Sequence, residues 1–208
     1  SEFERALRQR NALLKQTRGR LDEAAELTLE VWDAKVAAAG EELALRRADL
    51  VTQIEPIVST AYGDVAGTPQ PISLRYEAPW RSIGLAEALR SARADELRRG
   101  LTLVGPHRDD LVVSLNELPS RTHSSQGEQR SLALALRLAA HRLVNDVVGS
   151  PPVLLLDDVF SELDPDRSAA LLGSLPPGQT LLSTAAGLPT GVDADQVVTV
   201  TPGEVHSS

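Results

Sequence analysis

The chain has 208 residues, of which 42% are hydrophobic and 24% charged, a balance typical of a folded globular protein and not of a disordered one. It contains no cysteine, no apolar run of the about eighteen residues that a membrane span requires, and no signal peptide. These absences exclude a disulfide framework and thiolate metal sites and predict a cytoplasmic protein, while the net charge of −8 argues against a surface that coats DNA over its whole extent.

Residues 1–98 are predicted to form a mainly helical lobe with long antiparallel helices. A first helix should cover residues 1–18, and a longer one should run from residue 21 to about residue 59, where Pro56 and a stretch rich in glycine and proline should end it. Apolar residues recur at heptad spacing along the longer helix, which predicts that it packs lengthwise on a partner helix. These residues are Leu29, Val36, Leu43, Leu50 and Ile57.

A short strand and a third helix complete this lobe. Residues 71–76 alternate apolar and polar side chains, as a strand does, and this strand is free to join the sheet of the following domain. Ser82 is the expected N-cap of the third helix, which should end at Gly100 after two arginines.

Predicted strands alternate with predicted helices over residues 99–208. This alternation indicates an α/β fold class, with a sheet that is at least partly parallel and flanked by helices. Strands are expected over residues 101–104, 111–115, 153–156, 180–184 and 196–200, and helices over residues 126–148 and 166–175.

The stretch from Leu154 to Asp164 is the first candidate site. Three leucines run into Asp157 and Asp158, which predicts a buried central strand with two carboxylates at its carboxyl end, where open α/β sheets bind ligands. A charge pair at such a place is costly unless a cation or hydrogen-bond donors compensate it. One aspartate holding Mg²⁺ while its neighbour orients water would meet that cost; the alternative is a solvated turn, since aspartate is a common turn residue.

A second candidate site opens the long helix that precedes this strand. Ser125 and Glu128 have the spacing of a capping box, which stabilises the start of any helix. The same geometry also suits a phosphate, because unpaired N–H groups and the helix dipole point at an anion there, and Gly127 would let the phosphate approach the backbone. The residues alone leave both interpretations open.

Four stretches taken in order resemble a known family. The run Ser125–Arg130, an apolar helix and the run Leu154–Asp164 resemble the signature motif, Walker B strand and D-loop of ABC-type ATPases. Together with the runs Arg10–Lys15 and Gly105–Leu111, they resemble the RecF family of bacterial DNA repair and recombination ATPases, which are related to SMC heads.

This resemblance implies an ABC-type ATPase lobe, its C-terminal half over residues 99–208, next to the helical lobe. It implies a cytoplasmic protein that binds ATP and Mg²⁺, forms an ATP-dependent homodimer and binds double-stranded DNA and gap junctions. With RecO and RecR, such a protein helps load recombinase at single-strand gaps in DNA replication, repair, recombination and the SOS response. Alternatives are an SMC-like head that serves structural dimerisation, and an α/β interaction domain whose capping box and turn are coincidental.

The resemblance also implies roles for single residues. Asp157 matches the Walker B aspartate that helps hold Mg²⁺. Asp158 stands where most ABC-type ATPases have a glutamate that orients the attacking water, so it is the expected catalytic residue. The residues expected at the γ-phosphate and in the D-loop are Ser125, Gln126, Gly127 and Asp164.

Two departures from the family pattern change the expectation. No Gly-x-x-x-x-Gly-Lys-Ser/Thr run is present, and the chain starts at Ser1 without any methionine. We therefore expect the portion that follows the Walker A segment, inactive alone, from a protein that is a weak ATPase as a full-length dimer. The usual switch histidine is also missing, and Thr184 is the residue that could replace it.

Two further features concern DNA and the unassigned motif. The opening helix is basic, and Arg5, Arg8 and Arg10 are predicted to contact a phosphate backbone, with a merely solvated helix face as the alternative. The run Gly105–Leu111 is either a structural turn between two strands or part of an interface, and Arg108 within it either pairs with a neighbouring aspartate or reaches a phosphate.

Overall fold

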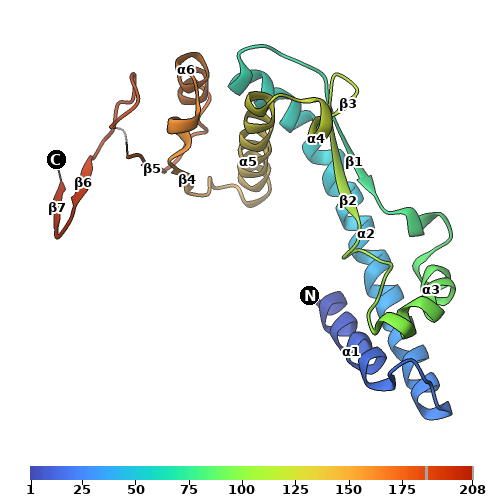
Figure 1. Cartoon of the computed structure of the whole chain (residues 1–208). Helices are drawn as coiled ribbons and strands as arrows, with labels where there is room; N and C mark the ends of the chain where they lie inside the picture. The colour runs from blue at the N-terminus through green and yellow to red at the C-terminus, as the bar shows by residue number, and fades with distance from the viewer. Residues whose placement is uncertain (186, 208) are drawn as a thin grey trace. The chain divides into compact units, whose positions relative to one another are not determined.

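The structure is a computed structural model that describes residues 1–185 and 187–207, apart from the side chain of Glu162 (Figure 1). The described residues form two compact units. The first unit comprises Ser1–Glu55 and Ser73–Pro119, and the second comprises Pro56–Ile72 and the residues from Ser120 onward. This division differs from the expected boundary at residue 98, because residues 101–109 are bound into the first unit and the second helix continues into the second unit.

Three helices build the first unit: α1 (Glu2–Thr17), the 44-residue α2 (Glu23–Ala66) and α3 (Leu85–Arg99). A capping box at Ser1 starts α1. The prediction that Ser82 caps α3 is wrong. The helix instead begins after Gly84, which has a φ of 83°, and the free N–H of Leu85 donates to Oε1 of Glu41 at 2.7 Å.

The core of the first unit lies where these helices pack around Trp80 of the short helix η1 (Pro79–Ser82). Gly40 of α2 allows this packing, because a Cβ there would overlap Leu85 of α3. Only part of the predicted heptad seam is buried, since Leu50 is 48% exposed. The buried residues of this core are Phe3, Ala6, Val36, Ala37, Ala44, Trp80, Leu85, Ala88 and Leu89.

The predicted end of α2 near residue 59 is also wrong. Pro56 lies inside the helix, which continues to Ala66. Proline at this place removes one hydrogen bond of the helix ladder. Burial of the following apolar side chains offsets that loss, because Val58, Ala61, Tyr62 and Val65 are all almost completely buried.

A three-stranded sheet flanks the helices of the first unit, in the order β1 (Ile72–Glu77), β2 (Asp110–Leu115) and β3 (Leu118–Pro119). The β2–β3 pair is antiparallel and turns through Asn116 and Glu117, whose φ angles are 51° and 67°. The strand predicted near residues 71–76 does join a strand from the following part of the sequence. The predicted strand over residues 101–104 is absent, because side chains of α1 and α3 take up its backbone N–H groups.

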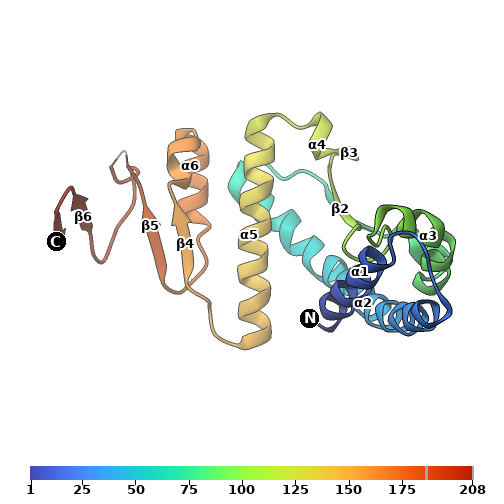
Figure 2. The same cartoon turned by 60° about the horizontal axis from the view of Figure 1, so that its bottom comes forward.

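The second unit contains the elements of the predicted α/β lobe from residue 120 onward (Figure 2). Strands β4 and β5 are parallel, in a register that runs from Leu154 opposite Thr180 to Asp157 opposite Ser183. A β6–β7 hairpin follows, in which β7 was not predicted. The elements are α4 (Ser120–His123), α5 (Gln126–Val148), β4 (Leu154–Asp157), η2 (Val159–Glu162), α6 (Pro165–Gly173), β5 (Thr180–Ser183), β6 (Val198–Thr201) and β7 (Glu204–Ser207).

Two contacts of α5 hold this unit together. Nε2 of His141 is 2.7 Å from the carbonyl oxygen of Pro152, which lies just before β4. Arg142 donates to Oδ2 of Asp64 at 2.9 Å and so ties α5 to the last turns of α2. Among the described residues, no helix is long and apolar enough to cross a membrane.

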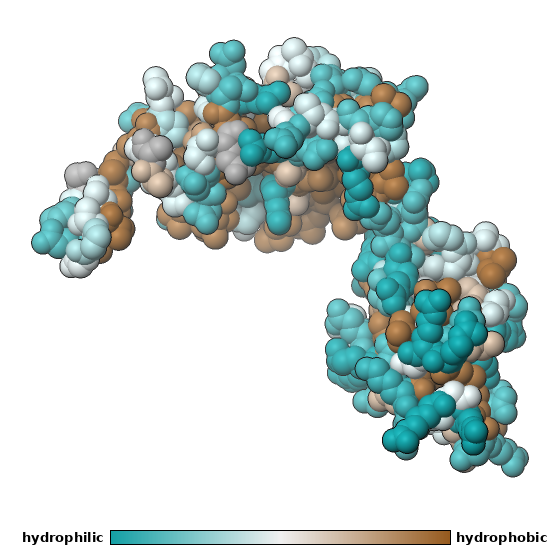
Figure 3. Space-filling model, in the orientation of Figure 1, coloured by the Kyte–Doolittle hydropathy of each residue, from teal (hydrophilic) through white to brown (hydrophobic). Residues whose placement is uncertain are grey.

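One face of the β4–β5 pair remains uncovered. Leu154 and Leu156 are buried, but Leu155 between them is 68% exposed and Leu181 of β5 is 53% exposed. The expectation of a buried central strand is therefore wrong for this chain, since among the described residues β4 pairs with β5 alone and Leu155 on one of its faces is exposed. Figure 3 shows apolar residues reaching the surface of this part of the chain.

Candidate nucleotide site

The two aspartates lie at the carboxyl end of β4, as predicted, next to Ser183 at the end of β5. Oδ1 of Asp157 accepts a hydrogen bond from the hydroxyl of Ser183, which orients that carboxylate. The N–H of Asp158 donates to the carbonyl of Ser183 at 3.1 Å. Asp158 has a φ of 49°, a conformation that aspartate tolerates better than most residues, and both carboxylates are exposed. They are thus held at a sharp strand-to-helix turn.

The donor set at this turn fits a magnesium ion that is shared with phosphates. Within the described residues, no group of three or more histidine, cysteine or acidic side chains is placed to hold a metal alone. Mg²⁺ in nucleotide sites is ordinarily bound by one or two carboxylates together with substrate phosphates and water. Asp157 and Asp158 match that smaller requirement.

The N-terminus of α5 forms the predicted capping box. The N–H and hydroxyl of Ser125 donate to Oε2 of Glu128 at 2.7 and 2.8 Å, and the N–H of Glu128 lies 3.3 Å from the hydroxyl oxygen. These bonds from the backbone and hydroxyl of Ser125, together with the nearby charge of Arg167, lower the pKa of Glu128. The serine hydroxyl is therefore engaged in the cap, so a phosphate there would have to share or replace this contact.

Gly127, in the first turn of α5, lies against a residue that the sequence interpretation missed. A Cβ at Gly127 would overlap Nη1 of Arg167 and would lie 3.2 Å from its Cζ. Arg167 follows Asp164 by three positions, and Asp164 is the N-cap of α6, with Oδ1 accepting from the Arg167 N–H at 2.9 Å. The structure thus brings Gly127, Asp164 and Arg167 together. The spacing of Asp164 and Arg167 in the sequence indicates the cap of α6 but not the contact with Gly127.

The two halves of the predicted site do not touch within the chain. In the part of the chain that the structure describes, no hydrogen bond or ion pair joins Asp157 or Asp158 to Ser125, Gln126 or Gly127. Gln126 is exposed at the start of α5. The roles of the two halves at a nucleotide therefore stay a prediction.

Thr184 follows β5 and donates from Oγ1 to the carbonyl of Gly187 at 3.2 Å. Its hydroxyl is therefore used within its own loop. A switch histidine would be expected in the run Leu182–Ala186, and Ala186 lies outside the described residues.

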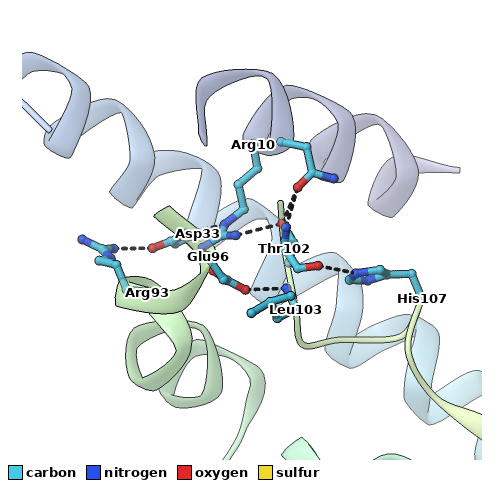
Figure 4. A network of polar contacts seen from close by, with 8 residues as sticks. Arg10, Asp33, Arg93, Glu96, Thr102, Leu103 and His107 are labelled. Atoms are coloured by element: carbon cyan, nitrogen blue, oxygen red, sulfur yellow. Dashed lines mark hydrogen bonds and ion pairs between the residues drawn. The ribbon is translucent and has the colours of Figure 1, made fainter. Parts of the chain in front are cut away.

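Arg10 is not part of a DNA-contact surface, which corrects the prediction made from the basic opening helix. Its side chain is fully buried and forms ion pairs with Asp33 at 2.6 Å and Glu96 at 2.7 Å (Figure 4). Nη1 also donates to Oγ1 of Thr102 at 2.8 Å. A guanidinium buried among two carboxylates and a hydroxyl cannot reach a phosphate, whereas Arg5 and Arg8 of the same helix are exposed.

Arg5 lies beside a shallow hollow of about 360 Å³ between α1 and α2. Lys35 and Trp32 also line it, with Nζ of Lys35 4.9 Å from the centre of the Trp32 ring. The ammonium over the ring is a cation–π contact. Arg5 and Lys35 at this hollow are exposed cations, as is Arg8 one turn further along α1.

The network around Arg10 explains why residues 101–104 form no strand. Oε1 of Glu96 accepts from the N–H of Leu103 at 2.7 Å, and Oδ1 of Asn11 accepts from the N–H of Thr102 at 2.8 Å. Arg93 pairs with Asp33 from the other side. Side chains of α1 and α3 thus satisfy the backbone that a neighbouring strand would otherwise bond.

The run Gly105–Leu111 begins as a tightly bound turn. Gly105 has a φ of 120°, and its carbonyl accepts from the N–H of Arg108 at 2.9 Å. Nη1 of Arg47 donates to the carbonyl of Pro106 at 2.5 Å, and Nε2 of His107 lies 3.1 Å from the carbonyl of Thr102. These contacts support the structural interpretation of the motif.

Asp109 accepts hydrogen bonds from other side chains of the first unit and does not pair with its neighbour Arg108 in the part of the chain that the structure describes. Its carboxylate accepts from the hydroxyl of Tyr76 and, at 2.8 Å, from Nε1 of Trp80. Burial and the Asp109 contact raise the pKa of Tyr76. Arg108 itself is exposed.

Comparisons with known proteins bear on this arrangement. No family model matches the chain. The chain is 43% identical over 222 residues to DNA replication and repair protein RecF of Streptomyces avermitilis, an alignment that covers 99% of this chain and 59% of that protein. It is 44% identical over 180 residues to the protein of the same name from Geobacter sulfurreducens, covering 82% of this chain and 47% of that one.

Solved structures agree with the sequence relatives. The structure of the recombination mediator protein RecF with ATP, from the RecFOR pathway, matches all of this chain and 57% of that one, with a TM-score of 0.82 and 28% identity. The structure of RecF with ATPrS matches 99% of this chain with the same TM-score and identity. The resemblance drawn from the four motifs is confirmed. The chain spans about half the length of the curated relatives it matches, and over that span it belongs to the RecF family.

Proposed function

We propose that this chain is part of an ATP-dependent DNA-binding protein of DNA repair and recombination. The observation that carries the proposal is the placement of Asp157 and Asp158 at the end of β4, preceded by the capped N-terminus of α5. The order of these two features is that of an ABC-type ATPase, and the relatives are RecF proteins solved with ATP or an ATP analogue.

In the proposed site, the two motifs of the chain contact ATP from opposite sides. Asp157 holds Mg²⁺, whose charge offsets that of the phosphates, and Asp158 orients the attacking water. Ser125, Gln126 and Gly127 contact the γ-phosphate of an ATP bound by a second copy, with Asp164 beside them. ATP would therefore hold two copies together, and turnover would be weak because this site has an aspartate where most ABC-type ATPases have a glutamate.

The phosphate cradle of the Walker A type has no counterpart in this chain. Among the described residues, β4 and β5 form a sheet of two strands, which supports the proposal that further strands extend its edges in the full-length protein. Leu155 and Leu181 on its uncovered face are apolar and more than half exposed, which supports the proposal that further structure also packs on this face. The chain alone, with half of the phosphate contacts missing, should hydrolyse no measurable ATP.

DNA binding is proposed to use the exposed cations of α1. Arg5 and Arg8 remain available for phosphate contacts, whereas Arg10 does not. By family, the DNA would be double-stranded DNA and gap junctions, and the partners RecO and RecR, with which the protein would load recombinase at single-strand gaps in the cytoplasm. The solved relative is described as a mediator of the RecFOR pathway.

The test uses the full-length protein and its Asp157→Ala variant. The wild type should self-associate when ATP and Mg²⁺ are added, measured by sedimentation, and hydrolyse ATP slowly. Asp157→Ala should lose hydrolysis by at least about a hundredfold. Asp146→Ala, an exposed position near the end of α5, serves as the matched control and should behave as the wild type. Unchanged hydrolysis in Asp157→Ala would remove the site assignment.

A further inference from the structure

Arg167 contacts Gly127, which lies forty positions before it in the sequence, and so connects the motif at the start of α5 with the one that ends at Asp164. It stands in the first turn of α6, and its guanidinium covers Gly127 in the first turn of α5. We propose that Arg167 is a positioning residue of the nucleotide site: it holds the loop that ends at Asp164 against the N-terminus of α5 and supplies positive charge there. This inference rests on the proposed ATP site at that helix end.

Two contacts fix Arg167 on the Asp164 side. Its backbone N–H donates to Oδ1 of Asp164 at 2.9 Å, and its Nη1 lies 3.5 Å from Oδ2 of the same carboxylate. The side chain is about one-third exposed, so it is accessible to a ligand and is also packed. Asp164 therefore holds the arginine at both its backbone and its guanidinium.

The charges at this place explain why a cation is needed. Glu128 is in the first turn of α5 and Asp164 caps α6, so two carboxylates lie near the turn where a phosphate is expected. An approaching γ-phosphate would be repelled by both if nothing offset them. The guanidinium of Arg167 acts on both, since it pairs with Asp164 and, after the two hydrogen bonds from Ser125, its charge contributes to the lowered pKa of Glu128.

Gly127 can now be explained in two ways, and they make different predictions. If the glycine is needed only so that a phosphate can approach the backbone, a methyl group at residue 127 harms binding whether or not Arg167 is present. If the glycine is needed to admit the guanidinium, a methyl group displaces Arg167 and does no further harm once Arg167 is gone. Because the overlapping atoms are at the end of a flexible side chain, Gly127→Ala should move the guanidinium and leave the fold intact.

The experiment is a double-mutant cycle on the full-length protein. The variants are Gly127→Ala, Arg167→Gln and the two combined, with Arg167→Lys as the conservative variant and Arg137→Gln, an exposed position on α5, as the control. The readouts are the ATP concentration that gives half-maximal self-association, KM and kcat for ATP, and the thermal midpoint.

We expect each single variant to raise the half-maximal ATP concentration and KM about tenfold, with little change in kcat. The combined variant should also lose about tenfold, and not the hundredfold of two independent effects. Arg167→Lys should recover part of the loss because it keeps the charge, and Arg137→Gln should match the wild type. The thermal midpoint should stay within about 2 °C, because the backbone cap at Asp164 does not need the side chain of Arg167.

Three outcomes overturn the inference: a wild-type response in Arg167→Gln, losses that multiply in the combined variant, or a loss that follows only a fallen thermal midpoint. In each of these cases, the wild type still associates with ATP and the proposed function stands. A wild type that does not associate with ATP removes the proposed function and this inference with it.

Discussion

Arg10 and Glu96 form an ion pair in which both side chains are completely buried, with Nη2 of the arginine 2.7 Å from Oε2 of the glutamate. The two atoms are in ionic contact without hydrogen-bond geometry, while the remaining donors of Arg10 bond Asp33 and Thr102. Helices α1, α2 and α3 and the segment after α3 all meet at this guanidinium (Figure 4). The first unit is therefore held at its centre by charge as well as by apolar packing.

Replacing Arg10 should be far more damaging than replacing its exposed neighbour. Arg10→Gln leaves Glu96 completely buried without its cation, whereas Asp33 keeps its ion pair with Arg93, so the free energy of unfolding should fall by about 3–5 kcal/mol. The control Arg8→Gln should change it by no more than about 0.5 kcal/mol. Urea unfolding followed by circular dichroism would measure both.

A second variant tests whether the destabilisation comes from leaving Glu96 charged and unpaired. Arg10→Met with Glu96→Gln removes both charges and keeps an acceptor for the N–H of Leu103, so it should be less destabilising than Arg10→Gln alone. If Arg10→Gln proved as mild as Arg8→Gln, the buried network would not have the importance given to it here.

The exposed arginines of α1 should act on DNA binding and not on stability. If Arg5 and Arg8 each neutralise one phosphate, the Arg5→Gln/Arg8→Gln variant should reduce the slope of log Kobs against log salt by about 1.8. Fluorescence anisotropy over a salt series with the full-length protein would measure the slope. Arg46→Gln is the matched control, because Arg46 is exposed and already paired with Glu42. An unaltered slope would assign Arg5 and Arg8 to solvation alone.

The turn at His107 should make the first unit less stable in mild acid. Although part of the His107 side chain is exposed, partial desolvation of its ring lowers its pKa below the ordinary value of 6.5, so the unfolded chain takes up a proton at a higher pH than the folded one. The stability that neutral His107 supports is therefore fully present above pH 6.5 and is lost as the pH falls through the folded-state pKa.

This titration can be followed at the residue itself. In a two-dimensional NMR titration, the ring signals of His107 should titrate with a midpoint below that of a histidine in a peptide. His107→Gln should reduce the change of the thermal midpoint with pH between pH 5 and 7. A midpoint of titration at or above that of the peptide would contradict the burial argument.

The uncovered face of β4 and β5 gives a prediction that depends on context. Leu155→Glu should improve the solubility of this chain expressed alone, because Leu155 is 68% exposed here. In the full-length protein the same change should reduce the free energy of unfolding by about 2 kcal/mol or more, because the residue would be buried beneath added structure. Val147→Glu, at an exposed position of α5, is the control and should be tolerated both in this chain alone and in the full-length protein. Equal tolerance of Leu155→Glu in the full-length protein would show that nothing covers this face.

The sequence predicts those features that depend on local pattern. The bounds of α5 and the order of the elements from α5 to β6 follow from apolar periodicity and capping, and the four motifs lead to the correct family. The errors arise where distant contacts decide the outcome. Ser82 does not cap α3 because Glu41 of another helix reaches Leu85, and residues 101–104 are not a strand because Asn11 and Glu96 take their N–H groups.

Arg10 and Arg167 show the same limit at the level of function. In the sequence, Arg10 is one of several arginines on a basic helix, and although it opens the run Arg10–Lys15, its buried role becomes visible only from its ion pairs with Asp33 and Glu96. Arg167 lies far along the chain from Gly127, so its contact with the helix end cannot be read from spacing. For both residues, the partner that decides the role is contributed by another element of the fold.

The position of Pro56 in α2 has a mechanical consequence. The chain crosses between the two compact units at three places, and the first of these, between Glu55 and Pro56, lies inside the continuous helix α2. No N–H is present at that residue to bond the carbonyl of Thr52, and helices bend most readily at such places. Helix α2 is thus expected to bend most readily at Pro56, the residue with which the second unit begins along the chain.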